Sequence, residues 1–177
     1  MKKAKLTFEG KAIELDVIVG SENEIGIDIG RLKTDSGFIT LDPGFKNTGS
    51  CESKVTFLDG ENGVLRYRGY SIEDLANNAD FLEVSYLLIY GELPTKKHYK
   101  KLLVDIQERS VLDEDVKKIL ETFPRSAHPM GMLSSLTSSL VAFDPSSVDV
   151  NNEEEMYDAF LNLLAKIPIL VAWVFRR

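Results

Sequence analysis

The two histidines are the first side chains to consider for acid–base or metal chemistry. His98 lies in the lysine-rich stretch KKHYKK, on the polar side of an amphipathic segment, so we interpret it as part of a solvated face. His128 directly precedes Pro129 at an expected helix start, where it could bind an anion or orient a loop. We favour a loop histidine bonded to the backbone. Their separation of 128 − 98 = 30 residues lacks the spacing of a metal site.

Two kinds of possible nucleophile are also present. Cys51 is the single cysteine, and Glu52 follows it. A reactive thiolate needs a positive neighbour or a helix N-terminus, so we interpret Cys51 as an inert thiol. Four serines outside any GxSxG context are interpreted as small residues that allow close helix packing: Ser134, Ser135, Ser138 and Ser139.

The acidic and glycine-rich stretches give no complete ligand set. The loop DGENG at 59–63 is not a phosphate loop, because no Lys-Ser/Thr pair follows it. Asp144, Asp149 and Glu153–Glu155 lack the calcium-loop pattern, and we interpret them as a solvated loop and helix start. The residues alone therefore assign no catalytic, cofactor-binding or metal-binding position.

Arg66 and Arg68 form the one functional question that the pattern leaves open. They alternate with apolar residues, so both are expected on one face of a strand. They could pair with Asp59 or Glu61, or hold an anionic partner, and we favour the structural role.

The bulk composition narrows the function classes. The 177 residues carry 21 basic and 28 acidic side chains, a net charge of −7, which disfavours nucleic acid as a partner. A single cysteine permits no internal disulfide and fits a cytoplasmic location. The longest apolar run, Ile169–Phe175, is shorter than the roughly 18–20 residues that span a bilayer, so we expect no membrane association.

Alternating apolar and polar residues predict short strands in the first third of the chain. The predicted strands cover 5–8 and 12–17, with weaker ones at 24–29 and 38–41. The Gly-, Asn- and Ser-rich stretch 42–51 is expected to be a loop. A hairpin is predicted from strands at 55–58 and 64–67 around the two glycines of DGENG.

From Ser71 onward the apolar period becomes helical. Helix starts are expected at Ser71 with Asp74, Asp80 with Glu83, Thr95, Pro129 and Asn152, and a stop at Gly91. The prediction is a mainly α fold with a small β-rich N-terminal segment (1–50), followed by a hairpin and a bundle of about six helices (51–177). Strands followed by helices, without alternation, argue against a doubly wound sheet.

The apolar segment after Pro168 is unusual. We expect Pro168 to open or kink a last helix that is apolar nearly all round and has no cap. Such a helix needs burial. We expect either a truncated chain or a large interface with another chain.

Several stretches together resemble citrate synthases, the bacterial type II branch most closely, and the resemblance extends over essentially the whole chain. The hairpin region closely resembles the N-terminal region of the family: SCESKVTFLDGENGVLRYRGYSIEDLA. Two earlier stretches resemble the branch's N-terminal β segment and its next segment: KAKLTFEGKAIELDVIVG and FITLDPGF. Four later stretches follow in the family's order and spacing: FLEVSYLLIYGELPT, AHPMGMLSSLTSSLVAF, VDVNN and LLAKIPILVAW.

The resemblance implies the N-terminal portion of an enzyme that condenses acetyl-CoA with oxaloacetate to give citrate and CoA. The segment 51–177 would then be an incomplete part of the large domain. In the family, the catalytic histidines, aspartate and arginines lie beyond the segment matched here, so no catalytic residue is carried over and the chain alone is expected to be inactive. Acetyl-CoA would be a co-substrate, and no cofactor is implied. Family members form dimers, and type II members often form hexamers, so a homo-oligomer is expected.

Some type II members have an NADH effector pocket. Its Arg-His-Thr segment aligns with Glu108-Arg109-Ser110, a tyrosine with Asp144 and an arginine with Asn162, and only Lys166 is kept. Acidic side chains where cations and an aromatic ring should meet a dinucleotide would repel its phosphates. We therefore predict weak or absent NADH inhibition.

Two alternatives stay open from the sequence. A fragment of a 2-methylcitrate synthase would use propionyl-CoA, and the acyl pocket that decides this lies outside the chain. A non-catalytic scaffold or assembly protein would keep the fold without the chemistry.

Overall fold

The computed structural model describes residues 2–143, 149 and 151–177. The chain divides into two compact units, Met1–Lys54 and Val55–Arg177. Each unit is described by itself below.

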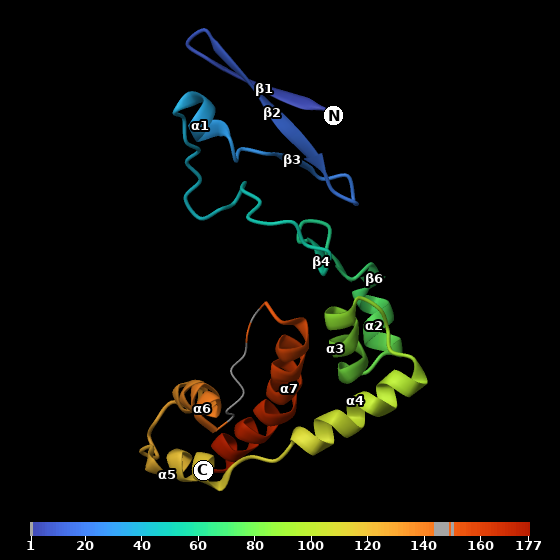
Figure 1. Ribbon diagram of the computed structural model, residues 1–177, viewed down its shortest axis with the longest axis vertical. Helices are drawn as coiled ribbons and strands as arrows, with labels where there is room; N and C mark the ends of the chain where they lie inside the picture. Colours follow the sequence, from blue (N-terminus) through green and yellow to red (C-terminus); the bar gives the residue numbers. More distant parts are fainter. Residues whose placement is uncertain (1, 144–148, 150) are drawn as a thin grey trace. The chain divides into compact units, whose positions relative to one another are not determined.

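The first unit is a small antiparallel sheet with one short helix (Figure 1). Strands β1 (Lys3–Phe8) and β2 (Lys11–Val19) form a hairpin, and β3 (Ile25–Ile27) pairs with β2. Helix α1 (Leu32–Ser36) ends at Gly37, which adopts the left-handed φ of 79° that glycine tolerates. The buried hydrophobic side chains of this unit are Leu15 and Leu32.

Two details of this unit differ from the sequence prediction. The strand expected at 38–41 is not formed, and the segment follows α1 as irregular chain with Ile39 and Leu41 exposed. A run with strand-like composition forms a strand only when another strand pairs with it. Helix α1 was not predicted, because five residues are too few to show a helical period.

The second unit begins with the predicted hairpin. Strands β4 (Thr56–Asp59) and β5 (Val64–Tyr67) are antiparallel, and a two-residue strand β6 (Tyr70–Ser71) extends the sheet. The Asp59 carboxylate closes the turn by accepting the backbone N–H groups of Glu61 and Asn62. These hydrogen bonds, with that from the Asn62 side chain as the largest cause, lower the pKa of Asp59.

Among the described residues of this unit, six helices follow: α2 (Ile72–Asn78), α3 (Phe81–Tyr90), α4 (Lys96–Arg109), α5 (Glu114–Thr122), α6 (Pro129–Phe143) and α7 (Glu153–Arg176). The predicted caps form. Ser71, Thr95 and Asn152 each accept a backbone N–H of the first turn, and Asp80 with Glu83 forms a capping box. The prediction of a mainly helical fold with small N-terminal antiparallel sheets is confirmed.

Pro168 neither opens a new helix nor ends one, since it lies inside the continuous α7. Proline removes one backbone donor, yet the helix is held on both sides of it by buried side chains. Leu161 and Ala165 precede Pro168, and Leu170 and Val174 follow it. Packing therefore prevails over the local preference.

Helix α7 contacts both α4 and α6 (Figure 1). It contributes side chains to two hydrophobic clusters. The aliphatic cluster lies among α5, α6 and α7 and consists of Val116, Leu120, Met132, Leu136, Leu140, Leu170 and Val174. The aromatic cluster lies among α3, α4 and α7 and consists of Tyr86, Leu102 and Leu161, with Leu82, Ile106, Tyr157 and Phe160 packed against them.

By length and composition alone, α7 could cross a membrane, and it is the one helix among the described residues that could. The apolar run that looked too short in the sequence is therefore part of a longer apolar helix. A core helix of a soluble protein passes the same test, so this is weak evidence for a span.

Candidate functional site

The candidate site is built around three tyrosines contributed by α3 and α7. Tyr86 and Tyr90 lie one turn apart on α3 with their ring centroids 4.1 Å apart, and Tyr157 of α7 lies 4.9 Å from Tyr90. His98 of α4 stacks on Tyr86, and its Nδ1 lies 3.1 Å from the Tyr86 hydroxyl. His98 is exposed, as the sequence predicts for a solvated face, but its ring also contacts this cluster.

Two adjoining cavities open at these rings. One of about 250 Å³ is lined by Tyr86, Tyr90, His98, Lys101, Leu102, Asp105 and Tyr157. The other, of about 760 Å³, is lined by Ile89, Tyr90, Glu153, Glu154, Met156, Tyr157 and Phe160. Because Tyr90 and Tyr157 line both, we treat the cavities together as the tyrosine groove.

Burial sets the protonation of these phenols. It raises the pKa of Tyr86 and, more strongly, that of Tyr90, where hydrogen bonding to Tyr157 adds to the effect. Both phenols therefore stay protonated at neutral pH. The Tyr86 hydroxyl and the His98 ring nitrogen are hydrogen-bonding groups, but Tyr86 does not supply a phenolate nucleophile at neutral pH.

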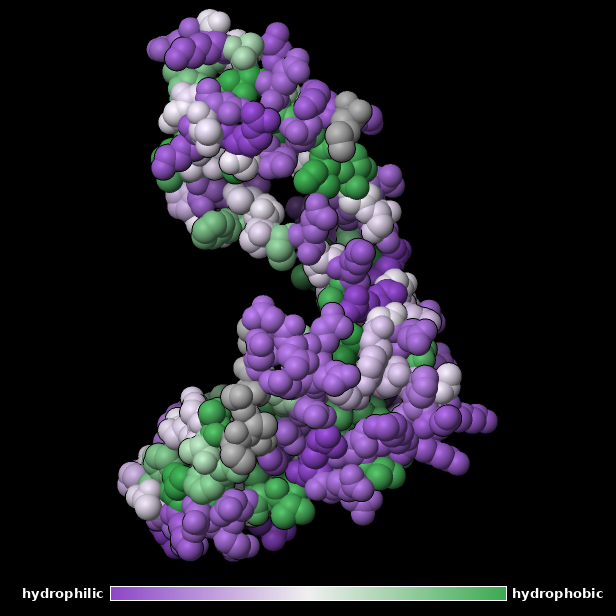
Figure 2. Space-filling model, viewed as in Figure 1, coloured by the Kyte–Doolittle hydropathy of each residue, from purple (hydrophilic) through white to green (hydrophobic). Residues whose placement is uncertain are grey.

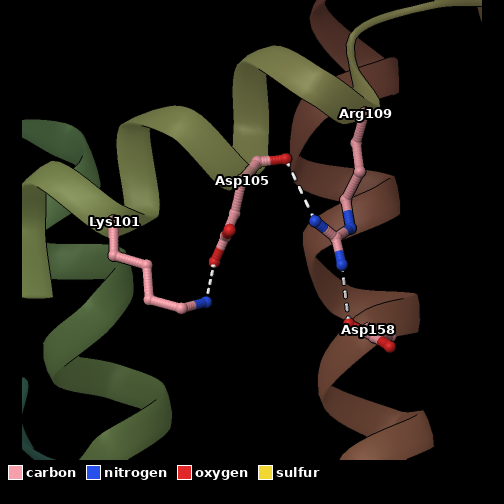
Figure 3. A network of polar contacts seen from close by, with 4 residues as sticks. All are labelled: Lys101, Asp105, Arg109 and Asp158. Carbon is pink, nitrogen blue, oxygen red and sulfur yellow. Dashed lines mark hydrogen bonds and ion pairs between the residues drawn. The ribbon is translucent and has the colours of Figure 1, made fainter.

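A chain of charged side chains runs from the groove across to α7 (Figure 3). Lys101 Nζ lies 2.6 Å from Asp105 Oδ2, and Arg109 Nη1 donates to the Asp105 carbonyl at 3.2 Å. Arg109 Nη2 then donates to Asp158 Oδ1 at 2.8 Å, which ties α4 to α7. The hydrogen bond to Asp105 raises the pKa of Lys101.

This network includes Arg109, one of the positions that align with a dinucleotide pocket. Arg109 is engaged by Asp158, so its guanidinium is already paired with a carboxylate. Asn162 and Lys166 both have interaction partners in the structure. Asp144 lies outside the described residues. The weak response to NADH stays a prediction.

Arg66 and Arg68 do not share one face of a strand as expected, because β5 ends at Tyr67 and Arg68 follows it with a φ of 50°. Arg68 Nη2 donates to the carbonyl of Leu88 at 2.9 Å, near the end of α3, which supports a structural role. Its Nε is buried without a hydrogen-bond partner. The Arg66 guanidinium lies 5.8 Å from the ring centre of Phe57, its neighbour on β4.

His128 and the serines of α6 make local contacts. His128 Nδ1 accepts the backbone N–H of Met130 at 3.2 Å, which matches a loop histidine bonded to the backbone. Ser135 and Ser139 donate to carbonyls of their own helix, Gly131 and Leu136. The expected close packing of these serines is not seen within the described residues, where Ser134, Ser135 and Ser138 are exposed.

The remaining candidates lie apart from the tyrosine groove. Cys51 is an exposed thiol beside a cavity of about 670 Å³ in the first unit. Asp149 accepts from Asn151, and Glu155 accepts from the backbone of Asp149, so these acids order the start of α7. Within the described residues, no group of three potential metal ligands comes together.

The sequence analysis missed the main components of this site, Tyr90, Tyr157 and Asp105. Tyr86 and Tyr90 at i and i+4, and Lys101, Asp105 and Arg109 at steps of four, were visible as same-face pairs. Their meeting with α7 was not visible, because it depends on helix packing. The described side chains that line the tyrosine groove include no nucleophile activated by a base.

Comparison with known proteins supplies the family. Residues 44–177 match the family model described as "Citrate synthase, C-terminal domain". The citrate synthase of Corynebacterium glutamicum is 45% identical over 174 residues, which cover 98% of this chain and 40% of that protein. Citrate synthase 1 of Mycobacterium tuberculosis is 39% identical over the same shares. The chain thus spans about 40% of the length of these relatives.

Solved structures agree with this. A ternary complex of citrate synthase from Thermoplasma acidophilum with carboxymethyl coenzyme A and oxaloacetate has a TM-score of 0.71 at 25% identity, over 77% of this chain and 36% of that one. Citrate synthase from Pyrobaculum aerophilum has a TM-score of 0.68 over 99% of this chain and 40% of its own. Its sequence is 24% identical, so this similarity shows the fold alone.

Proposed function

The chain belongs to the citrate synthase family, and we propose that it is the N-terminal portion of a type II citrate synthase. The complete enzyme would condense acetyl-CoA with oxaloacetate to give citrate and CoA. The observation that carries the proposal is 45% identity to a citrate synthase over 98% of this chain. The matching family model is described as a C-terminal domain, so the N-terminal position rests on the order of the sequence motifs instead.

The proposed substrates are supported by a relative. The Thermoplasma acidophilum enzyme binds carboxymethyl coenzyme A together with oxaloacetate. An acyl-CoA and a dicarboxylate are therefore the ligand classes that we assign to the complete enzyme. A cytoplasmic location and assembly into a homo-oligomer complete the proposal.

The role of this chain in that enzyme would be positional. Its described residues provide no activated nucleophile and no cluster of three potential metal ligands. The second unit, Val55–Arg177, would supply helices of the large domain, and the first, Met1–Lys54, the type II β-rich segment. The proton transfers from acetyl-CoA would be performed by residues outside the matched region.

The test is an assay of CoA release, followed with a thiol reagent, on two proteins. This chain alone should release no CoA above background from acetyl-CoA and oxaloacetate. A chimera that joins this chain to the part of the Corynebacterium glutamicum enzyme outside the matched 174 residues should release it. Activity of the chain alone would contradict the assignment of the chemistry, and a folded but inactive chimera would favour a non-catalytic scaffold.

A further inference from the structure

The wider cavity of the tyrosine groove has an aromatic wall. Tyr90 of α3 and Tyr157 of α7 both line it, and their rings are inclined by 56° with centroids 4.9 Å apart. Tyr90 is 45% exposed, so its ring is not enclosed by the cluster behind it. The face of an aromatic ring carries partial negative charge, and a corner formed by two rings therefore attracts a cation.

Carboxylates lie at the same cavity. Glu153 and Glu154, in the first turn of α7, line it and are exposed. Figure 2 shows hydrophilic side chains gathered over this start of α7. The neighbouring Glu155 accepts from Asn152 and from the backbone of Asp149, so it serves the start of the helix instead. Within the described residues, no lysine, arginine or histidine lines this cavity.

The narrower cavity adds no unbalanced positive charge. Lys101 lines it, but its Nζ lies 2.6 Å from the carboxylate of Asp105, which lines it as well. His98 has its Nδ1 at 3.1 Å from the Tyr86 hydroxyl. The groove as a whole therefore combines aromatic rings with an excess of carboxylates, and it is complementary to a cation and not to an anion.

The remaining lining limits which cation fits. Ile89, Met156 and Phe160 make much of the wider cavity apolar. Its volume of about 760 Å³ is within the range of small-molecule sites. A small inorganic cation would keep its water and gain nothing from apolar side chains. An organic cation can place its hydrocarbon against them while its charge meets the rings and carboxylates.

We propose that the wider cavity of the tyrosine groove binds a quaternary ammonium ion, with its positive charge against the rings of Tyr90 and Tyr157. The carboxylates of Glu153 and Glu154 supply the counter-charge. A quaternary ammonium ion has no N–H group that loses a hydrogen bond on leaving water, so an aromatic and apolar lining suits it. This binding is independent of the condensation proposed above.

The experiment titrates choline into this chain and follows binding by saturation-transfer NMR. Choline should bind saturably with a Kd of about 1–10 mM. Dimethylbutanol, its uncharged carbon isostere, should bind at least about fivefold more weakly, because it lacks the charge that the rings attract. Equal binding of the two compounds, or no saturable binding of choline below about 50 mM, would overturn the proposal.

Tyrosine variants locate the bound cation. Tyr157→Leu removes a ring and should weaken choline binding about fivefold, whereas Tyr157→Phe keeps the ring and should stay within about twofold. The matched control is Tyr70→Leu on β6, a tyrosine that is 41% exposed and lies outside the groove. It should leave binding unchanged, and circular dichroism checks that each variant keeps the fold. Unchanged binding by a folded Tyr157→Leu variant would contradict the site.

The carboxylates are tested by a double variant. Glu153→Gln with Glu154→Gln should weaken choline binding about threefold and leave that of dimethylbutanol unchanged. Glu73→Gln with Asp74→Asn, which changes the first-turn acids of α2, is the matched control and should have no effect. Displacement of choline by Ca²⁺, together with unchanged binding by Tyr157→Leu, would assign the acids to a metal ion and overturn the proposal. None of these measurements depends on CoA release, so either proposal can fail without the other.

Discussion

The two clusters that share α7 differ in what surrounds them. The aliphatic cluster is built from leucine, valine and methionine side chains of α5, α6 and α7. The aromatic cluster contains phenols, a nearby imidazole and an ion-pair chain, and the tyrosine groove opens beside it. One helix thus contributes to an aliphatic core at one end and to the tyrosine groove at the other.

This difference separates stability from binding. Close-packed aliphatic side chains stabilise the fold but offer a ligand no hydrogen bonds. Phenols and paired charges contribute less free energy at a surface, yet they can position a polar ligand. The most sensitive substitutions for folding should therefore lie at the C-terminal half of α7 and its neighbours.

The largest expected losses of stability come from truncating two buried leucines, one in each cluster. Leu136→Ala removes a fully buried side chain from the aliphatic cluster and should lower the free energy of unfolding by about 3–4 kcal/mol. Leu161→Ala, in the aromatic cluster, should cost about 2 kcal/mol, because neighbouring side chains that border the groove can shift into the space left by the leucine. Urea unfolding followed by circular dichroism measures both. Equal losses would remove the distinction between the clusters.

The next largest loss of stability is expected at Asp80, the N-cap of α3, which accepts a hydrogen bond from Tyr99 of α4. The Asp80 carboxylate accepts the Glu83 N–H at 2.8 Å and the Tyr99 hydroxyl, and the hydroxyl is the main reason that its pKa is lowered. Asp80→Ala should cost about 1 kcal/mol at pH 7. The native pKa is lowered below 3.8, so the ionised Asp80 stabilises the fold above that pH and loses this effect as pH falls through the native pKa.

The control for this prediction is Asp80→Asn, which keeps a capping oxygen but cannot ionise. Thermal unfolding from pH 7 to pH 2 should show the difference between wild type and Asp80→Asn shrinking below pH 3.8. A difference that grows with acid would contradict the sign of the pKa shift.

The sequence predicted the helix caps around both clusters better than the packing of the helices against one another. Caps at Ser71, Asp80, Thr95 and Asn152 depend on residues three or fewer positions apart, so the pattern contained them. The Arg109–Asp158 pair joins residues 49 positions apart and follows only from packing of α4 on α7. Pro168 shows the opposite case, since its local preference was visible but tertiary contacts overrode it.

A smaller effect is expected from the ion pair between α4 and α7. Arg109→Gln removes the contact with Asp158, whose side chain is 62% exposed, and should cost no more than about 1 kcal/mol. Because salt screens exposed pairs, the loss should vanish in about 1 M NaCl. Lys118→Gln, which breaks the pair with Asp115 at the start of α5, is the matched control without a contact between helices. A salt-independent loss would show that Arg109 acts through packing.

The smallest expected effect is the binding of NADH at the positions aligned with the effector pocket. Glu108 stands where the resembling effector pocket has an arginine, and Arg109 is already paired with Asp158. A dinucleotide would bring two phosphates toward an acidic side chain and a neutralised cation, which disfavours binding. Titration of NADH, followed by its fluorescence, should show no saturable binding up to about 1 mM. The double variant Glu108→Arg and Asn162→Arg restores both cations and should raise the affinity. Tight binding by the unchanged chain would contradict this prediction and would show that NADH binding does not need those charges.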